Sequence, residues 1–483
     1  MIATVVLALS VLQDPGVEPC YVVEDLPIPT ELVPEIGGID FAQDGSLWVV
    51  SRRGMVWKVD VDTLKWSLFA EGLHECTGVL AGADPHEVII ADRPSITRVV
   101  DTDHDGVADF YEVITEDFGV SGNYHEYTFT PVRDAAGHLF FGLGCASNGA
   151  GIFKIVRGPF EPLGRPGRMY SCVPYRGWIL ERTPDGQTLP FASGFREPNG
   201  LGFDLDGNLF VTDNQGDWLG TSKMFHVERG NFYGHVSSLV WDPSFEGDPL
   251  KAPIEELERR RTRACILFPH GKLANSPTQL LVDSSQGKFG PFAGQFFTGC
   301  INLRRTLRIA LEEVNGEFQG AVFPFLDGPP LRTGNNRLAW SPDGTSLYLG
   351  QGSRAWAGGE GLQRIRWTGQ PPMSLHHVGL REQGFDLHFT APVDPASASD
   401  PTGYAVKHYY YHYHRPYGSP VVGLTSAPVA AVELLEGDTV VRLTLPPMVQ
   451  HRVYEITMPD LQAADGRPLD HDTAYYTLNQ LRQ

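Results

Sequence analysis

The chain has 483 residues, of which 42% are hydrophobic and 20% charged, so it is too apolar to be disordered and too long for one ordinary domain. Lysine and arginine number 38 against 58 aspartates and glutamates, which gives a formal net charge of −20. Because such a surface repels phosphate backbones and anionic lipid, we expect no nucleic-acid partner.

The N-terminus begins with an apolar run from Ile2 to Leu12. This run is about half the ~20 residues that a membrane-spanning helix needs, so no membrane span is expected. It is typical of a signal-peptide core, and we expect residues 1–13 to be a signal peptide and the protein to be secreted or periplasmic. No lysine or arginine precedes the run, and a buried first strand is the alternative.

One pattern returns along most of the chain: a short apolar strand, an Asp-Gly type turn and a second apolar strand. The six copies start at Gly38, Gly78, Tyr127, Gly200, Gln279 and Arg337. A third strand follows each copy, so the unit is a small antiparallel meander that cannot bury both of its faces alone. Units of this kind pack radially as blades. The repeat therefore predicts an all-β fold with a six-bladed β-propeller over residues 21–370.

Within the second copy, the segment DTDHDGVADFYE has the spacing of a calcium loop. Its oxygen ligands would be Asp101, Asp103, Asp105, the carbonyl of Val107, Asp109 and Glu112. The preceding SITRVV predicts a strand rather than an entering helix, so we expect a structural calcium loop between the outer strands of the second blade. A solvated acidic turn is the alternative.

The repeat also predicts where functional groups converge. If each Asp-Gly turn joins the two inner strands at one end, residues before the first strand and after the second meet at the other end, beside the central channel. His125 is the single candidate base there, because an imidazole can take a hydroxyl proton near neutral pH. The candidate ligand-binding residues at this end are Arg53, Arg196, Asn199, Asp213, Asn214, Arg304 and Arg337.

The arginines of this set indicate an anionic or heavily hydroxylated ligand, because they exceed what solubility requires of so acidic a chain. Charged loop residues that pair with one another at a rim are the alternative.

After Trp367 the repeat stops, and residues 374–483 show alternating strands separated by proline, aspartate and glycine, which predicts a small β-sandwich. On one predicted strand a face is shared by His408, Tyr410, His412 and His414. A metal site there is one interpretation. We favour the other, a polar aromatic face against a neighbouring domain.

The six cysteines include no CxxC and no CxxCH, which excludes a zinc ribbon and a covalently attached c-type haem. Two alternatives stay open for them. They could form disulfides, with Cys145–Cys172 and Cys265–Cys300 as the candidate pairs, or remain buried thiols.

At these residues the chain resembles the six-bladed propellers of the glucose/sorbosone dehydrogenase group, soluble aldose dehydrogenases that use pyrroloquinoline quinone, as in secreted propeller proteins of planctomycete-type bacteria. The motifs are GNYHEYTF, the stretch from Ala192 to Trp218, NFYGH, GPFAGQFFTG and GNNRLAWSPDG. The tail is similar to the Ig-like domain that often follows in those proteins. The resemblance implies that His125 takes the proton of a sugar hydroxyl, that Arg196 holds the quinone, and that an electron-acceptor protein is a partner.

Two departures from the dehydrogenase pattern stand beside these residues. Glu126 and Tyr127 replace a small, glycine-rich stretch, and Glu197 stands where the dehydrogenases have asparagine. A carboxylate beside an anionic quinone is unfavourable unless arginine neutralises it.

The PNG motif with Asn199 and the later Asp213 also resembles the gluconolactonase-type propellers, which hold a divalent ion in the channel and hydrolyse lactones. Three functions thus stay open. We favour a quinone-dependent sugar dehydrogenase over a metal-dependent lactonase and over a non-catalytic module that binds extracellular glycan or protein.

Overall fold

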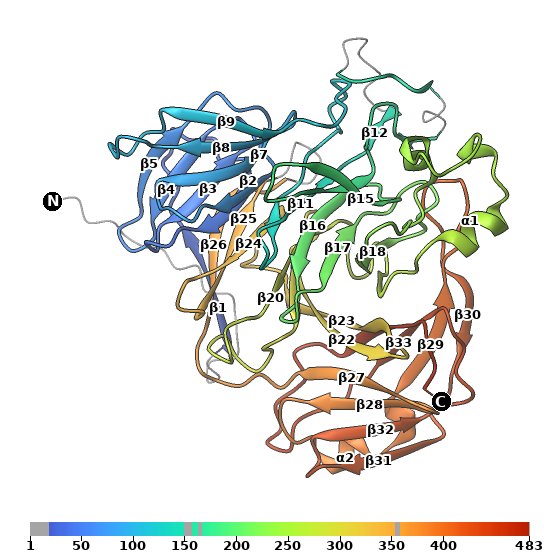
Figure 1. Cartoon of the computed structure of the whole chain (residues 1–483). Coiled ribbons are helices and arrows are strands. Elements are labelled where there is room, and N and C mark those ends of the chain that lie inside the picture. The colour runs from blue at the N-terminus through green and yellow to red at the C-terminus, as the bar shows by residue number, and fades with distance from the viewer. Residues whose placement is uncertain (1–18, 149–156, 163–166, 353–357, 483) are drawn as a thin grey trace.

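The computed structural model describes residues 19–148, 157–162, 167–352 and 358–482, and it consists mainly of antiparallel strands (Figure 1). The predicted signal peptide lies outside the described residues. Within the described ranges, no helix is long and apolar enough to cross a membrane.

Six four-stranded antiparallel units follow one another along the chain, and the first three are meanders. The first unit is β2 (Ile36–Phe41), β3 (Leu47–Ser51), β4 (Val56–Asp60) and β5 (Lys65–Ala70). The second is β6 (Gly78–Ala81), β7 (Glu87–Ala91), β8 (Ile96–Val100) and β9 (Phe110–Thr115). The third is β10 (Val132–Arg133), β11 (Leu139–Leu143), β14 (Trp178–Arg182) and β15 (Thr188–Ser193), with a ribbon of β12 (Ala146–Ser147) and β13 (Met169–Tyr170) inserted.

The last three units repeat this plan, and the N-terminal strand completes the sixth. The fourth unit is β16 (Pro198–Phe203), β17 (Leu209–Asp213), β18 (Ser222–His226) and β19 (Ile266–Phe268). Between β18 and β19 lie η3 (Val236–Trp241), η4 (Pro249–Lys251) and α1 (Ile254–Arg260). The fifth unit is β20 (Pro277–Val282), β21 (Phe296–Cys300), β22 (Arg305–Val314) and β23 (Glu317–Asp327). The sixth is β24 (Asn335–Trp340), β25 (Ser346–Gln351), β26 (Gly361–Trp367) and, as its outer strand, β1 (Tyr21–Leu26).

The units close into a ring because each hydrophobic core is shared by two neighbours. Trp48 of the first unit packs in one core with Val88 of the second, and the last core joins Tyr348 of the sixth unit to Trp57 of the first. Four further cores join the units between them in the same way. A unit therefore buries its two faces only when both neighbours are present, as the repeat predicted.

The remaining strands form two sheets on either side of one core. One sheet is β27 (Leu375–Arg381), β28 (Gly384–Phe389), β32 (Val440–Thr444) and β31 (Ala431–Leu435). The other is β34 (Thr473–Leu478), β33 (Arg452–Thr457), β29 (Ala405–Tyr410) and β30 (Val422–Ser426). The short helices α2 (Pro395–Ala398) and η5 (Pro401–Gly403) precede β29.

The second of these sheets is continuous with the fifth unit, which the sequence did not indicate. Strand β34 pairs with β23, with Gly320 opposite Thr477 and Val322 opposite Tyr475. Strands β22 and β23 are 10 and 11 residues long, and Phe323 of β23 lies in the C-terminal core. One eight-stranded sheet therefore runs across the predicted domain boundary.

The two candidate disulfides, Cys145–Cys172 and Cys265–Cys300, are not formed, and of the two alternatives the buried thiols hold for these four cysteines. The Cys265 thiol instead donates to the backbone carbonyl of Met224 at 3.1 Å. Burial raises the pKa of Cys265 to about 12, so this thiol is inert at neutral pH.

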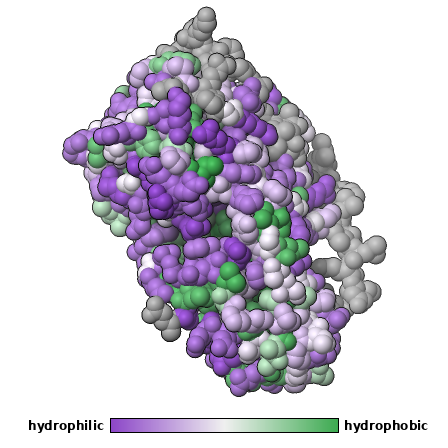
Figure 2. All heavy atoms as spheres, turned by 90° about the vertical axis from the view of Figure 1, so that its right-hand side faces the viewer, coloured by the Kyte–Doolittle hydropathy of each residue, from purple (hydrophilic) through white to green (hydrophobic). Residues whose placement is uncertain are grey.

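The face of the molecule on the right of Figure 1 is mainly hydrophilic, and its hydrophobic side chains lie in small separate groups (Figure 2). This agrees with the acidic composition of the chain.

Candidate active site

A cavity of about 570 Å³ opens at one end of the ring. Most of its walls come from residues at the start of or before the first strand of a unit, or after the second strand. All six units contribute, through Arg52, Thr77, His125, Arg196, Asn199, Asn214, Ser276, Asn302, Asn336, Arg337 and Gly352. The inner-strand turns lie at the opposite end of these strands. The cavity is thus where the repeat predicted a site.

His125 forms a close pair with Glu197 in the wall of this cavity. The distance from His125 Nδ1 to Glu197 Oε2 is 2.8 Å, and the two side chains are 16% and 5% exposed. His125 Nδ1 also lies 3.1 Å from the carbonyl oxygen of Cys145. Both neighbours of Nδ1 are acceptors, so Nδ1 carries the proton of the neutral ring and Nε2 keeps a lone pair.

Asp213, at the end of β17, holds the loop that carries Glu197. Its carboxylate accepts the backbone N–H groups of Arg196 at 3.1 Å and of Glu197 at 2.6 Å. Burial raises the pKa of Asp213, while nearby Lys223 opposes that shift. A Cβ at Gly144 would lie 2.8 Å from Glu197 Oε1, so glycine there leaves room for the carboxylate. Asp213 therefore shapes the site from behind the cavity wall.

Arg337 is fully buried and bonds to three parts of the ring. It donates to the carbonyl of Gly37 at 2.7 Å, to Asn199 Oδ1 at 2.9 Å and to the carbonyl of Thr77 at 2.5 Å. Burial lowers its pKa to about 9. Asn199 in turn donates to Asn336 Oδ1 at 3.3 Å. These residues form a hydrogen-bonded polar part of the wall.

The same bonds bear on the divalent ion that the gluconolactonase resemblance implied. The side-chain oxygen of Asn199 is taken by Arg337, and the carboxylate of Asp213 is taken by backbone amides. Among the described residues, the one cluster of three potential metal ligands is Asp101, Asp103 and Asp105, outside this cavity. The oxygens of Asn199 and Asp213 are thus already engaged in hydrogen bonds within the ring.

Several polar atoms around the cavity are buried without a hydrogen-bond partner in the described part of the chain. They are Arg52 Nε, Arg196 Nε, Glu197 Oε1, Asn214 Oδ1 and Asn302 Oδ1. Four arginines line the cavity, whereas Glu197 is the one carboxylate among its described lining residues. Because buried polar groups are costly when unpaired, this wall is suited to a ligand rich in anionic and hydroxyl oxygens.

Glu197 is itself neutralised within the site. Arg196 Nη1 lies 3.2 Å from Glu197 Oε2, the oxygen that also faces His125. The sequence marked Glu197 as a departure that needed a neighbouring arginine, and the structure provides it. Its pairing with His125 had no sequence signal, since the two lie 72 positions apart in the chain.

Two of the predicted ligand-binding arginines lie outside the cavity. Arg304 is exposed, and Arg53 is exposed and pairs with Glu35 at 3.2 Å. Arg52 lines the cavity instead and donates to the hydroxyl of Tyr127 at 3.1 Å. Both Arg52 and Arg53 follow the last residue of β3, where strand alternation no longer determines which side chain points inward.

Two further lining residues were not predicted at all. Arg168 lies just before β13, and Tyr417 comes from the C-terminal region, far from the other lining residues in sequence. No repeat or motif marks either residue. Only the folded chain brings them to the cavity.

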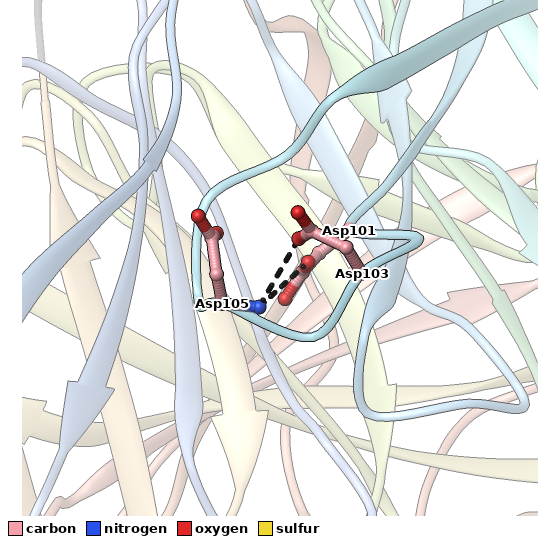
Figure 3. Close-up of side chains that lie close together, drawn as sticks. All are labelled: Asp101, Asp103 and Asp105. Carbon is pink, nitrogen blue, oxygen red and sulfur yellow. Dashed lines mark hydrogen bonds between the residues drawn. The ribbon is translucent and has the colours of Figure 1, made fainter.

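The acidic loop between β8 and β9 brings three carboxylates together (Figure 3). Ligand atoms of Asp101, Asp103 and Asp105 all lie within 4.8 Å of one another. The buried Asp101 carboxylate accepts the backbone N–H groups of Gly106 at 2.9 Å and of Asp105 at 3.2 Å. These bonds fold the loop around the carboxylates.

The other predicted calcium ligands make different contacts. Asp109 accepts the backbone N–H and the hydroxyl of Thr102 at 2.9 and 2.6 Å. Glu112 lies on β9 and pairs with Arg98 at 3.3 Å. Val107 is exposed, and its N–H donates to Asp105 at 2.9 Å. The structure therefore brings the first three predicted ligands, Asp101, Asp103 and Asp105, close to one another.

The histidine face predicted in the C-terminal region does not form as one strand. Strand β29 ends at Tyr410, so His412 and His414 lie beyond it, and His414 Nε2 contacts the carbonyl of Gly418 at 2.7 Å. Within the described ranges, no cluster of three metal-binding groups includes these histidines.

No protein-family model matches the chain, and no curated protein matches it. Solved structures do. An oxidoreductase (glucose dehydrogenase) from Thermus thermophilus matches with a TM-score of 0.50 and 18% identity over 71% of this chain and 99% of that one. The PQQ domain of pyranose dehydrogenase from Coprinopsis cinerea matches with a TM-score of 0.50 and 13% identity over 73% of this chain and 99% of that one.

A Trichoderma reesei protein of carbohydrate-active enzyme family AA12 matches with a TM-score of 0.51 and 12% identity over 73% of this chain and 97% of that one. At these identities the likeness shows the fold. The chain has the fold of the propeller dehydrogenases, and the resemblance to the glucose/sorbosone dehydrogenase group is confirmed at that level.

Proposed function

We propose that the protein is a secreted or periplasmic sugar dehydrogenase, in which a six-bladed propeller carries an Ig-like C-terminal domain and oxidises a sugar hydroxyl with pyrroloquinoline quinone. The observation that carries this proposal is the His125–Glu197 pair in a cavity lined by four arginines. The solved structures of similar fold, which include a glucose dehydrogenase and a PQQ domain, add support.

His125 would act as the base. Its Nδ1 proton points to the acceptors Glu197 and Cys145, so Nε2 is the atom with a lone pair for the hydroxyl proton. Glu197 would fix the ring and stabilise the positive charge that the ring gains when it takes the proton. Glu197 would therefore be a positioning residue and His125 the catalytic one.

The cavity residues fit an anionic quinone. Arg52 and Arg196 each have a buried Nε without a partner in the described ranges, and Asn214 and Asn302 each offer a buried side-chain oxygen. These residues would hold the cofactor's oxygens and its N–H group. When bound, the quinone would supply a two-electron acceptor for the hydride of the sugar carbon, and an electron-acceptor protein would later take both electrons.

We also propose that the acidic loop binds calcium. Three carboxylates within 4.8 Å of one another repel each other unless a cation or protons neutralise them. The loop joins β8 to β9, the outer strands of the second unit, so the ion would stabilise that unit rather than take part in catalysis.

The two other functions, a metal-dependent lactonase and a non-catalytic binding module, would each give a different result in the experiment below. Lactone hydrolysis would require a metal where Asn199 and Asp213 are already bonded to other groups, so no observation favours it. A non-catalytic module would bind sugar in the cavity without oxidising it.

The test is dye reduction by the purified protein supplied with the quinone, calcium and a panel of aldoses. We expect turnover in the wild type, its loss in His125→Ala with quinone binding retained, and weaker quinone binding in Arg196→Ala. His138→Ala is the matched control, because His138 also lies near a buried glutamate, Glu181 at 3.5 Å, but outside the cavity. Quinone-independent lactone hydrolysis, or sugar binding without turnover, would refute the proposal.

A further inference from the structure

The segment between β29 and β30 docks on the fourth unit of the ring. The N–H of Gly418 donates to the carbonyl of Gly216 at 3.0 Å, and the N–H of Ser419 donates to the carbonyl of Gly220 at 2.9 Å. Tyr417 forms an isolated antiparallel bridge with Asp217. The C-terminal region is thus joined to the loop that follows β17, next to the proposed active site.

Two glycines show that this contact is closely fitted. A Cβ at Gly220 would lie 2.8 Å from the Cβ of Tyr411 and 3.0 Å from that of Ser419. Gly418 has a φ of +70°, and a Cβ there would lie 2.8 Å from the side chain of Gln215. A larger residue at Gly220 would push the segment away from the ring, and a side chain at Gly418 would be strained by the positive φ.

This docking places Tyr417 in the wall of the cavity. The Arg168 guanidinium lies 4.2 Å from the centre of the Tyr417 ring, and Arg196 Nη2 lies 3.4 Å from the Tyr417 hydroxyl. Asp217 accepts the N–H of Met169 at 2.5 Å, which fixes the residue next to Arg168. The loop that follows β17 therefore positions both Tyr417 and Arg168, which form an aromatic–cation pair.

Burial places this pair at the rim. Arg168 is exposed and Tyr417 is half-buried, whereas Arg196, Asn199 and Arg337 are buried. A cofactor bound to the buried groups would not cover the rim, so the rim would contact the substrate. A tyrosine ring and hydroxyl beside a guanidinium offer an apolar surface and donors, which together suit a sugar ring with hydroxyl groups.

We propose that Tyr417, supplied by the C-terminal region, is a specificity-determining residue for the sugar substrate, and that Arg168 acts with it at the rim. This inference rests on the proposed dehydrogenase function. It gives the C-terminal region a part in the site itself, because the cavity wall is incomplete without residue 417.

The experiment measures kcat and KM for the aldose panel at saturating quinone. We expect Tyr417→Ala to raise KM about 10-fold or more for the preferred sugar, to change the order of preference among the aldoses, and to leave kcat within about threefold. Tyr417→Phe should raise KM by less, because it keeps the ring. Tyr111→Ala, on the outer strand β9 and 43% exposed, is the control and should match the wild type.

Gly418→Ala serves as a second variant, since a Cβ at a φ of +70° strains the segment next to Tyr417 without altering that residue. Unchanged KM and preference in folded Tyr417→Ala, with normal turnover, would overturn this inference and leave the proposed function standing. If Tyr417→Ala does not fold, unchanged KM in Tyr417→Phe and Gly418→Ala would overturn it. Absence of quinone-dependent turnover in the wild type would overturn both.

Discussion

Removal of the Glu197 charge tests the role of the His125–Glu197 pair. The substitution Glu197→Gln keeps the size of the side chain and one oxygen, but it removes the negative charge 2.8 Å from His125 Nδ1. A hydrogen bond to a charged group contributes about 1.5–3 kcal/mol. Little solvent screening is expected, because the two side chains are 16% and 5% exposed. The expected loss in kcat is therefore roughly 10- to 150-fold.

The same substitution should not weaken binding of the quinone. Glu197 is the one carboxylate among the described lining residues, so its removal leaves the cavity more positive. We expect quinone affinity to stay the same or rise while kcat falls, as measured by absorbance titration and dye reduction on the same preparation. A defect in folding would lower both.

Glu181→Gln is the matched control. Glu181 is also buried, and it lies between His138 at 3.5 Å and Arg229, outside the cavity. This variant should keep the wild-type kcat. Wild-type turnover in Glu197→Gln, or an equal loss in Glu181→Gln, would refute the role assigned to the pair.

Two arginines, the acidic loop and a buried histidine each allow a further test. Arg52→Ala should weaken quinone binding about 10-fold or more and Arg53→Ala less than twofold in the same titration, because only Arg52 lines the cavity. Chelation of calcium should lower the melting temperature, and the double variant Asp103→Ala with Asp105→Ala should melt identically with and without chelator; an equal response of wild type and variant would leave the loop a plain turn. Burial lowers the pKa of His235 to about 3, below the unfolded value of about 6.5. The free energy of unfolding is therefore at its full value above pH 6.5 and falls by up to about 1.4 kcal/mol per pH unit as the pH drops toward 3, because the unfolded histidine takes up a proton first. Urea unfolding at pH 6.5 and 4.5 should show a smaller loss for His235→Gln than for wild type, and an equal loss would contradict this.

The repeat predicted much of the fold because its information is local. An apolar strand, an Asp-Gly turn and a second apolar strand specify a hairpin from adjacent residues, as at Asp206–Gly207, where Gly207 has a φ of +87°. The copies then have to pack side by side to bury their faces. The pairing of β34 with β23 carries no such signal, since it joins strands about 150 residues apart.

The site was predictable only where position along a strand determines it. His125, Arg196, Asn199, Asn214 and Arg337 line the cavity because each lies before, at the start of or just after an inner strand.

The cavity-lining residues whose place depends on tertiary packing were not predictable from their position along a strand. The choice of Arg52 over Arg53 follows from the turn after β3, and the place of Tyr417 follows from the docking of a distant segment. The choice between disulfides and buried thiols stayed open because spacing in sequence does not report the distance between thiols.

Binding of pyrroloquinoline quinone in the cavity is tested most directly by an absorbance titration of the purified protein with the quinone in the presence of calcium. We predict a saturable spectral change with one quinone per chain at micromolar concentration or below, lost or weakened at least tenfold in Arg52→Ala and Arg196→Ala. A linear, unsaturated response at micromolar quinone, or equal binding by the wild type and both variants, would contradict it.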